Sequence, residues 1–205
     1  MRPGASASLR SLRSPLRAAT ILGPVLLSMS LTPQGDAACP NIISRQLWGA
    51  SPSAAVHYIT TPVPDVIVGH TAGPRCGSET ACAREVHSIQ QQHKDLGFGD
   101  IGYGFLIGGD AGYVFQGRGW HQRGAHTYGY NNKSIGVAFL GDYSDAGAST
   151  RQMNALRDLL QCGVQLGELP DDVRVYGQRQ VQRTESPGLA LYQQLQELPQ
   201  WVEVP

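Results

Sequence analysis

Short apolar runs alternate along the chain with longer segments in which apolar residues recur every three or four positions. A short apolar run bounded by Gly, Pro or Asp is typical of a buried strand. Residues 108–112, Gly-Gly-Asp-Ala-Gly, separate two such runs, and we expect them to form a hairpin loop. We expect five strands, at residues 65–70, 103–107, 113–116, 135–140 and 173–176.

Three longer segments have the apolar spacing of helices with one buried face. They cover residues 79–96, 150–166 and about 187–198. Ser149 is suited to start the second helix and Gly167 to end it, and we expect Ser186 to be the N-cap of the third, with Pro187 at its first position. Strands interleaved with helices indicate a single α/β domain, in which three main α-helices pack on a mixed central β-sheet.

The N-terminal segment differs from the rest of the chain in charge. Residues 1–35 hold four arginines and no acidic residue, and an apolar stretch at about residues 18–31 follows the arginines. A basic start, a short apolar run and small residues near Ala37 are typical of a secretory signal peptide, although organelle transit peptides are also rich in Arg and Ser. We therefore expect a signal peptide at residues 1–37 and a domain at residues 38–205. The apolar stretch is too short to predict a membrane span.

Composition narrows the class of protein further. The 205 residues suit one domain, and 41% hydrophobic against 16% charged residues is typical of a globular chain. The 16 basic and 16 acidic residues balance, which argues against binding nucleic acid through clustered positive charge. Removal of residues 1–37 would take four arginines and Asp36, leaving a net charge of −3. That value also argues against attack on membranes by bulk positive charge.

All four cysteines follow the predicted signal peptide, at Cys39, Cys76, Cys82 and Cys162. An even number in an exported chain indicates disulfides, and four cysteines allow three pairings. Cys76 and Cys82 lie close enough for a local loop, which would leave Cys39 with Cys162. No Cys-x-x-Cys pair occurs, so a zinc finger is not indicated.

Candidate chemistry rests mainly on histidines. His70 ends a predicted strand beside Gly73, and a histidine in that place can face a cleft, although an ordinary surface histidine has the same pattern. His126 also lies between predicted strands, whereas His87 and His93 are expected on a helix, facing solvent. Neither a Gly-x-Ser-x-Gly elbow nor a His-Glu-x-x-His motif occurs, and the carboxylates are scattered.

Six ordered motifs give the chain a family resemblance. They are at residues 68–73, 100–108, 117–120, 124–126, 134–137 and 140–143. With them, residues 39–201 resemble the peptidoglycan recognition proteins. The resemblance implies the amidase-type α/β fold shared with phage zinc amidases, and a groove that binds muramyl peptides. It also implies disulfides that join Cys76 to Cys82 and Cys39 to Cys162.

The chain departs from the family's catalytic members at the zinc site. The resemblance places the three zinc ligands at His70, Gln178 and Ser186, where catalytic members carry His, His and Cys. A neutral amide oxygen and an un-ionised hydroxyl are poor zinc ligands compared with imidazole and thiolate. We therefore expect no cofactor and no catalytic residues. Tyr103 matches the family's catalytic tyrosine and is expected to contact ligand instead.

The resemblance implies five ligand-contacting residues, which are His70, Thr71, Tyr103, His126 and Asn131. A histidine that the family carries on the first helix falls at Gln92 here, with His93 one position away. The expected function is a secreted, non-catalytic pattern-recognition protein of innate immunity, extracellular or in granules, whose partner is bacterial peptidoglycan and which could be antibacterial. One alternative is a zinc-dependent N-acetylmuramoyl-L-alanine amidase with a rearranged metal site. Another is a fold retained only for protein–protein contact.

Overall fold

The computed structural model describes residues 39–203, together with Met1 and Gly4. The predicted signal peptide, residues 1–37, lies outside the 39–203 range, in which all elements below occur. Within the described part of the chain, no helix is long and apolar enough to cross a membrane. Both expected disulfides are present, one joining Cys39 to Cys162 and the other Cys76 to Cys82.

Six strands form one mixed sheet in the order β1-β4-β3-β5-β2-β6, in which all neighbours are parallel except the β3–β4 hairpin. They are β1 (Ile42–Ile43), β2 (Asp65–His70), β3 (Phe105–Gly108), β4 (Tyr113–Gln116), β5 (Ser134–Phe139) and β6 (Arg174–Gly177). The five expected strands and the hairpin are confirmed. The sequence did not predict β1, because two residues are too few to show a pattern.

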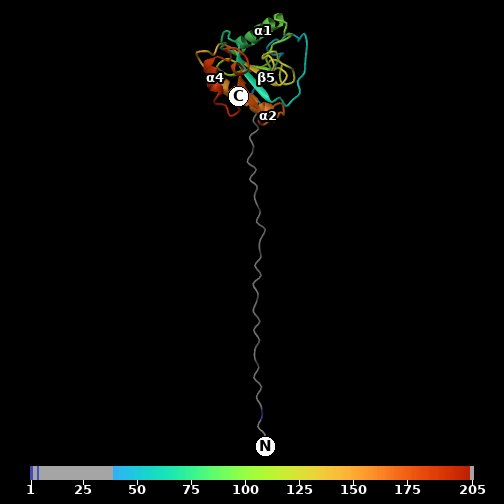
Figure 1. Ribbon diagram of the computed structural model, residues 1–205, viewed down its shortest axis with the longest axis vertical. Coiled ribbons are helices and arrows are strands. Elements are labelled where there is room, and N and C mark those ends of the chain that lie inside the picture. Colours follow the sequence, from blue (N-terminus) through green and yellow to red (C-terminus); the bar gives the residue numbers. More distant parts are fainter. Residues whose placement is uncertain (2–3, 5–38, 204–205) are drawn as a thin grey trace. The chain divides into compact units, whose positions relative to one another are not determined.

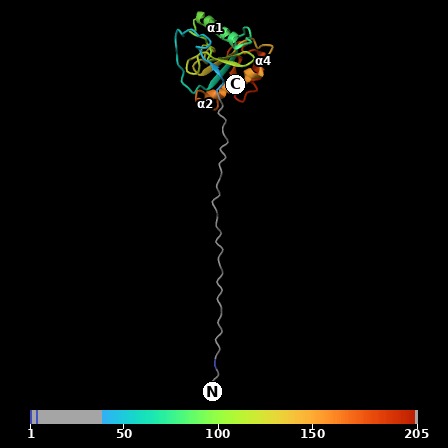
Figure 2. The same ribbon diagram turned by 180° about the vertical axis from the view of Figure 1, so that it is seen from behind.

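Two long helices, α1 (Glu79–Asp95) and α2 (Thr150–Gln165), lie on opposite faces of this sheet (Figures 1 and 2). Successive side chains of β3 point to opposite faces of the sheet, and each face packs into its own hydrophobic core. Phe105 and Ile107 join the core that includes the buried face of α2, whereas Leu106 joins the core that includes the buried face of α1. The expected α/β class, with helices packed on a mixed sheet, is confirmed.

The predicted ends of α2 are also confirmed. The Ser149 hydroxyl accepts from the Gln152 N–H (3.2 Å), and the Gln152 side chain accepts from the Ser149 N–H (2.8 Å), which completes a capping box. Gly167 follows the C-cap with φ +72°, a conformation that glycine adopts without strain.

The third predicted helix is shorter than expected, and the assignment of Ser186 as its N-cap is wrong. Helix α4 spans Leu189–Leu195, and its N-cap is Gly188, with φ +87°. A Cβ at Gly188 would collide with the backbone of Tyr143, so the chain turns tightly there before the helix starts. The Ser186 hydroxyl accepts instead from the backbone N–H of His70 (2.9 Å). A four-residue helix, α3 (Gln178–Val181), was not predicted.

Candidate functional site

The sheet brings the candidate residues to one edge. Strands β2, β5 and β6 are parallel neighbours, so their carboxyl ends lie together. His70 is the last residue of β2, and Gln178 follows the last residue of β6. The carboxyl ends of strands are where open α/β sheets form binding sites.

The backbone N–H of His70 and the Nδ1 of its ring are both hydrogen-bonded within the protein. Its backbone N–H donates to Ser186, and its ring Nδ1 accepts from the backbone N–H of Tyr143 (3.1 Å). Burial lowers the pKa of His70, and Arg179 lowers it further, while the Asp142 carboxylate, 3.8 Å from Nδ1, opposes both. The ring is therefore neutral at pH 7. Because Nδ1 accepts a hydrogen bond, Nε2 carries the proton and is a donor.

Gln178 and Ser186 converge over the glycine that precedes His70. A Cβ at Gly69 would lie 2.8 Å from Oε1 of Gln178 and 2.9 Å from Oγ of Ser186. The Gln178 Nε2 donates to the carbonyl of His126 (2.8 Å), and this bond aims Oε1 at Gly69. The close approach requires glycine at position 69, because any side chain there would displace both groups.

The donor set at this edge does not fit a zinc ion. The imidazole of His70 uses its lone pair on Tyr143, Gln178 presents an amide oxygen, and Ser186 presents a hydroxyl. Zinc in proteins is held by thiolate, imidazole or carboxylate. Among residues 39–203, no three or more His, Cys, Asp or Glu side chains are grouped so as to hold a metal.

His126 and Asn131 lie in the loop that precedes β5. The Asn131 Oδ1 accepts from the N–H groups of His126 (2.9 Å) and Thr127 (3.0 Å), so its carbonyl shapes this loop. The His126 ring lies against Gly136, where a Cβ would be 2.5 Å from its carbons. Its Nδ1 meets the Thr127 hydroxyl (3.0 Å), and its Nε2 is buried without a hydrogen-bond partner among the described residues. Burial lowers the pKa of His126 to about 4.

An open pocket of about 250 Å³ adjoins the His126 loop. Its lining residues are Phe98, Ala125, His126, Thr127, Tyr128, Asn131 and Gln182. Of the five predicted ligand-contacting residues, His126 and Asn131 line it. The other three do not line it. His70 is linked to it indirectly, since Gln178 donates to the His126 carbonyl and its Oε1 lies over Gly69, the residue before His70.

An aromatic wall stands beside this pocket, formed by His93, Phe98 and Tyr103. The ring of His93 lies 5.3 Å from that of Phe98 and 5.5 Å from that of Tyr103. Its Nδ1 accepts from the N–H of Gly102 (2.9 Å). The expectation that His93 simply faces solvent is therefore wrong. Nothing in the sequence pointed to Phe98. The only signal for His93 was that a histidine which the family carries on the first helix aligns with Gln92, one position away.

Thr71 and Tyr103 have distinct surroundings. The Thr71 hydroxyl accepts from the N–H of Gly141 (3.0 Å), which ties the end of β2 to the loop after β5. Burial raises the pKa of Tyr103, so its phenol stays neutral.

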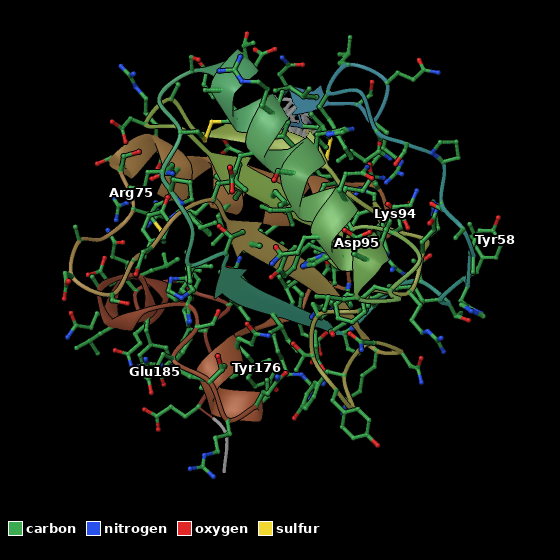
Figure 3. The ribbon with its side chains drawn as sticks, turned by 90° about the horizontal axis from the view of Figure 1, so that it is seen from above. Tyr58, Arg75, Lys94, Asp95, Tyr176 and Glu185 are labelled. Carbon is green, nitrogen blue, oxygen red and sulfur yellow. A yellow bond between two sulfur atoms is a disulfide. The ribbon has the colours of Figure 1, made fainter. Side chains whose placement is uncertain are left out.

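Figure 3 shows Arg75 and Glu185, the neighbour of Ser186, on one side of α1 and Tyr58 on the other.

We expect the free energy of unfolding to fall as the pH falls from about 6.5 to about 4. In this window an unfolded histidine binds a proton and folded His126, with a pKa of about 4, does not, so acid favours the unfolded chain. The loss from His126 alone approaches about 3 kcal/mol. Urea unfolding at several pH values measures it. The control is His126→Gln, which should flatten the profile, and an equally steep profile in this variant would contradict the assignment.

Comparisons with known proteins agree with this fold. The family model described as N-acetylmuramoyl-L-alanine amidase matches residues 59–189. Peptidoglycan-recognition protein SA of Drosophila melanogaster is 42% identical over 191 residues, which cover 90% of this chain and 94% of that protein. The chain belongs to the peptidoglycan recognition protein family, within the amidase fold.

Solved structures agree. The structure of the Drosophila peptidoglycan recognition protein SA superimposes with a TM-score of 0.79 at 43% identity, covering 82% of this chain and 96% of that one. Peptidoglycan recognition protein LE, solved in complex with tracheal cytotoxin, gives a TM-score of 0.77 at 34% identity and covers 80% of this chain and 96% of that one. The family and the fold expected from the motifs are confirmed.

Proposed function

We propose that this chain is a secreted protein that binds bacterial peptidoglycan at the strand edge described above and does not hydrolyse it. Family membership supports the ligand class. The ligand in the structure of the relative LE is described as monomeric diaminopimelic acid-type peptidoglycan. The two disulfides support export, because such bonds persist in oxidising compartments.

The observation that carries the non-hydrolytic part of the proposal is the pair Gln178 and Ser186. Both side chains converge over Gly69, and both offer neutral oxygens. Hydrolysis by a zinc amidase needs a metal ion that lowers the pKa of its bound water. The side chains of His70, Gln178 and Ser186 do not fit such an ion. The same two oxygens are suited to hydrogen bonds with neutral amide or hydroxyl groups of a ligand.

The remaining residues of the edge match the chemistry of a muramyl peptide. The protonated Nε2 of His70 can donate to a carbonyl, and the ring of Tyr103 offers a flat apolar face with one polar atom. The pocket at His126 and Asn131 is open and adjoins the aromatic wall. Sugar rings stack on such faces, while the amides of a stem peptide need the polar atoms around them.

We expect Tyr103→Ala to weaken binding of a soluble muramyl pentapeptide by about 10-fold, since a buried aromatic contact contributes roughly 1–2 kcal/mol. Titration calorimetry measures the change. Tyr103→Phe is the matched control, because it keeps the ring and should lose less. Circular dichroism on all three proteins separates loss of contact from loss of fold. Unchanged affinity in folded Tyr103→Ala would exclude this residue from the site.

A peptidoglycan pulldown, combined with a hydrolysis assay of the purified wild-type protein, tests the function as a whole. Binding without release of stem peptide is the expected result. Release of stem peptide would favour the alternative of a zinc amidase with a rearranged site. Failure to bind insoluble peptidoglycan or muramyl peptides would favour a fold used only for protein contact.

A further inference from the structure

A second chemical feature lies beside the proposed binding site and takes no part in it. Asn132, Lys133 and Ser134 form an Asn-x-Ser sequence, the acceptor pattern for N-linked glycans in exported proteins. No other Asn in the chain is followed two positions later by Ser or Thr. The pattern is short, so its weight depends on where the structure places it.

The structure places Asn132 where a large substituent can project. Asn132 and Lys133 are exposed and lie in the turn before β5, whose backbone closes with the Lys133 N–H donating to the Tyr130 carbonyl (2.9 Å). The Arg123 guanidinium donates to Oδ1 of Asn132 (3.4 Å) and not to the nitrogen that would carry a sugar. The folded chain therefore accommodates a glycan at this residue without rearrangement.

The hydroxyl of the acceptor pattern has a different environment. Ser134 is buried at the start of β5, and its Oγ donates to the Tyr130 carbonyl (2.8 Å). A transferase that must engage this hydroxyl cannot reach it once β5 has joined the sheet. Modification would therefore precede folding, during passage into the secretory compartment.

We propose that Asn132 carries an N-linked glycan in the exported protein and that this glycan screens the neighbouring pocket. The Nδ2 atom forms a bond to the anomeric carbon of an oligosaccharide carried on a lipid diphosphate. The bond from that carbon to the diphosphate oxygen breaks, the lipid diphosphate leaves, and the amide gives up one proton. No oxidant or reductant is needed.

The pocket concerned is open, measures about 440 Å³ and has Asn132 in its wall. Its lining also includes Arg123, Tyr128 and Asn131, and Tyr128 is 93% exposed. Because Asn131 also lines the pocket at His126, a glycan on Asn132 stands at the rim of the proposed binding site. It would restrict the approach of bulky polymeric peptidoglycan from this side. This consequence rests on the proposed function, whereas the modification rests only on export.

The test is expression of the full chain in a secreting animal cell line, with analysis of the protein from the medium by intact-mass spectrometry. We expect one glycan, removed by peptide-N-glycosidase F with conversion of Asn132 to Asp. Asn132→Gln should lose it, and Ser134→Thr, which keeps the acceptor pattern, should retain it. Secreted wild-type protein without carbohydrate, or a glycan that persists in Asn132→Gln, would overturn the proposal.

Screening of the pocket has its own readout. Nitration of Tyr128 by tetranitromethane should rise severalfold after the glycan is removed from the native wild-type protein. In Asn132→Gln the same enzyme treatment should change nothing. Equal nitration of Tyr128 with and without the glycan would contradict screening. Because neither readout uses peptidoglycan, failure here and failure of the proposed function are distinguishable.

Discussion

The double variant Gln178→His/Ser186→Cys is expected to retain stoichiometric zinc after dialysis, whereas the wild-type chain retains none. The replacements place an imidazole and a thiol at two positions whose side chains already converge beside His70. We expect apparent zinc affinity to rise by more than about 100-fold. Each single variant, with two suitable ligands at most, should gain less.

The cost of reorganising His70 does not prevent this result. Binding of a metal through Nδ1 would break the hydrogen bond from the Tyr143 N–H, at about 1 kcal/mol. Structural zinc sites with four protein ligands contribute on the order of 10 kcal/mol or more, and a site with three of these ligands and a water keeps a large enough share to exceed that cost. Emission spectrometry of dialysed protein measures the metal. Adding His70→Ala to the double variant should abolish binding, and equal zinc content in wild type and double variant would refute the ligand argument.

Removal of the Cys39–Cys162 disulfide by Cys39→Ala/Cys162→Ala is expected to lower the free energy of unfolding by about 5 kcal/mol. The two cysteines are 123 residues apart in sequence, so this bond restricts the unfolded chain more than any short loop does. The replacement also leaves a small void, because Cys162 is buried against the core. Guanidinium unfolding of both forms measures the difference.

The second disulfide supplies the matched comparison. Cys76 and Cys82 are only 6 residues apart, so Cys76→Ala/Cys82→Ala should cost about 2 kcal/mol on the same argument. Cys82 is also fully buried, so the two double variants differ mainly in loop length. A similar cost for both would show that the entropy of the unfolded chain is not the main source of the stabilisation.

Much of the fold could be predicted from local pattern. The apolar runs identify five of the six strands, and the apolar spacing identifies α1 and α2, because periodicity reports directly which face is buried. Capping residues identify the ends of α2, since a cap acts over three or four residues. The start of α4 could not be predicted this way, because the turn at Gly188 packs closely against the backbone of Tyr143, a residue distant in sequence.

Part of the candidate site could also be predicted from the sequence, and part could not. The resemblance to the family points to His70, Gln178 and Ser186 as the zinc-ligand positions, and it points to Tyr103 and His126 as ligand-contacting residues. It does not identify the environment of His93, which depends on the loop that carries Gly102 and Phe98 returning to α1. A helix pattern places a polar residue on a face but does not say what later segment covers that face.

The sequence by itself indicated most of the element types and the family, because those properties depend on residue identity and on local spacing. Through the family resemblance, it also places an amide and a hydroxyl at two positions where catalytic members carry zinc ligands. Only the tertiary structure decided which hydrogen bonds the side chains at the edge of the sheet make. It assigned the lone pair of His70 to Tyr143, the hydroxyl of Ser186 to the His70 backbone, and the amide of Gln178 to the His126 loop. Each bond joins segments far apart in the chain. Its direction is set by how the strands and loops pack, which no local pattern records.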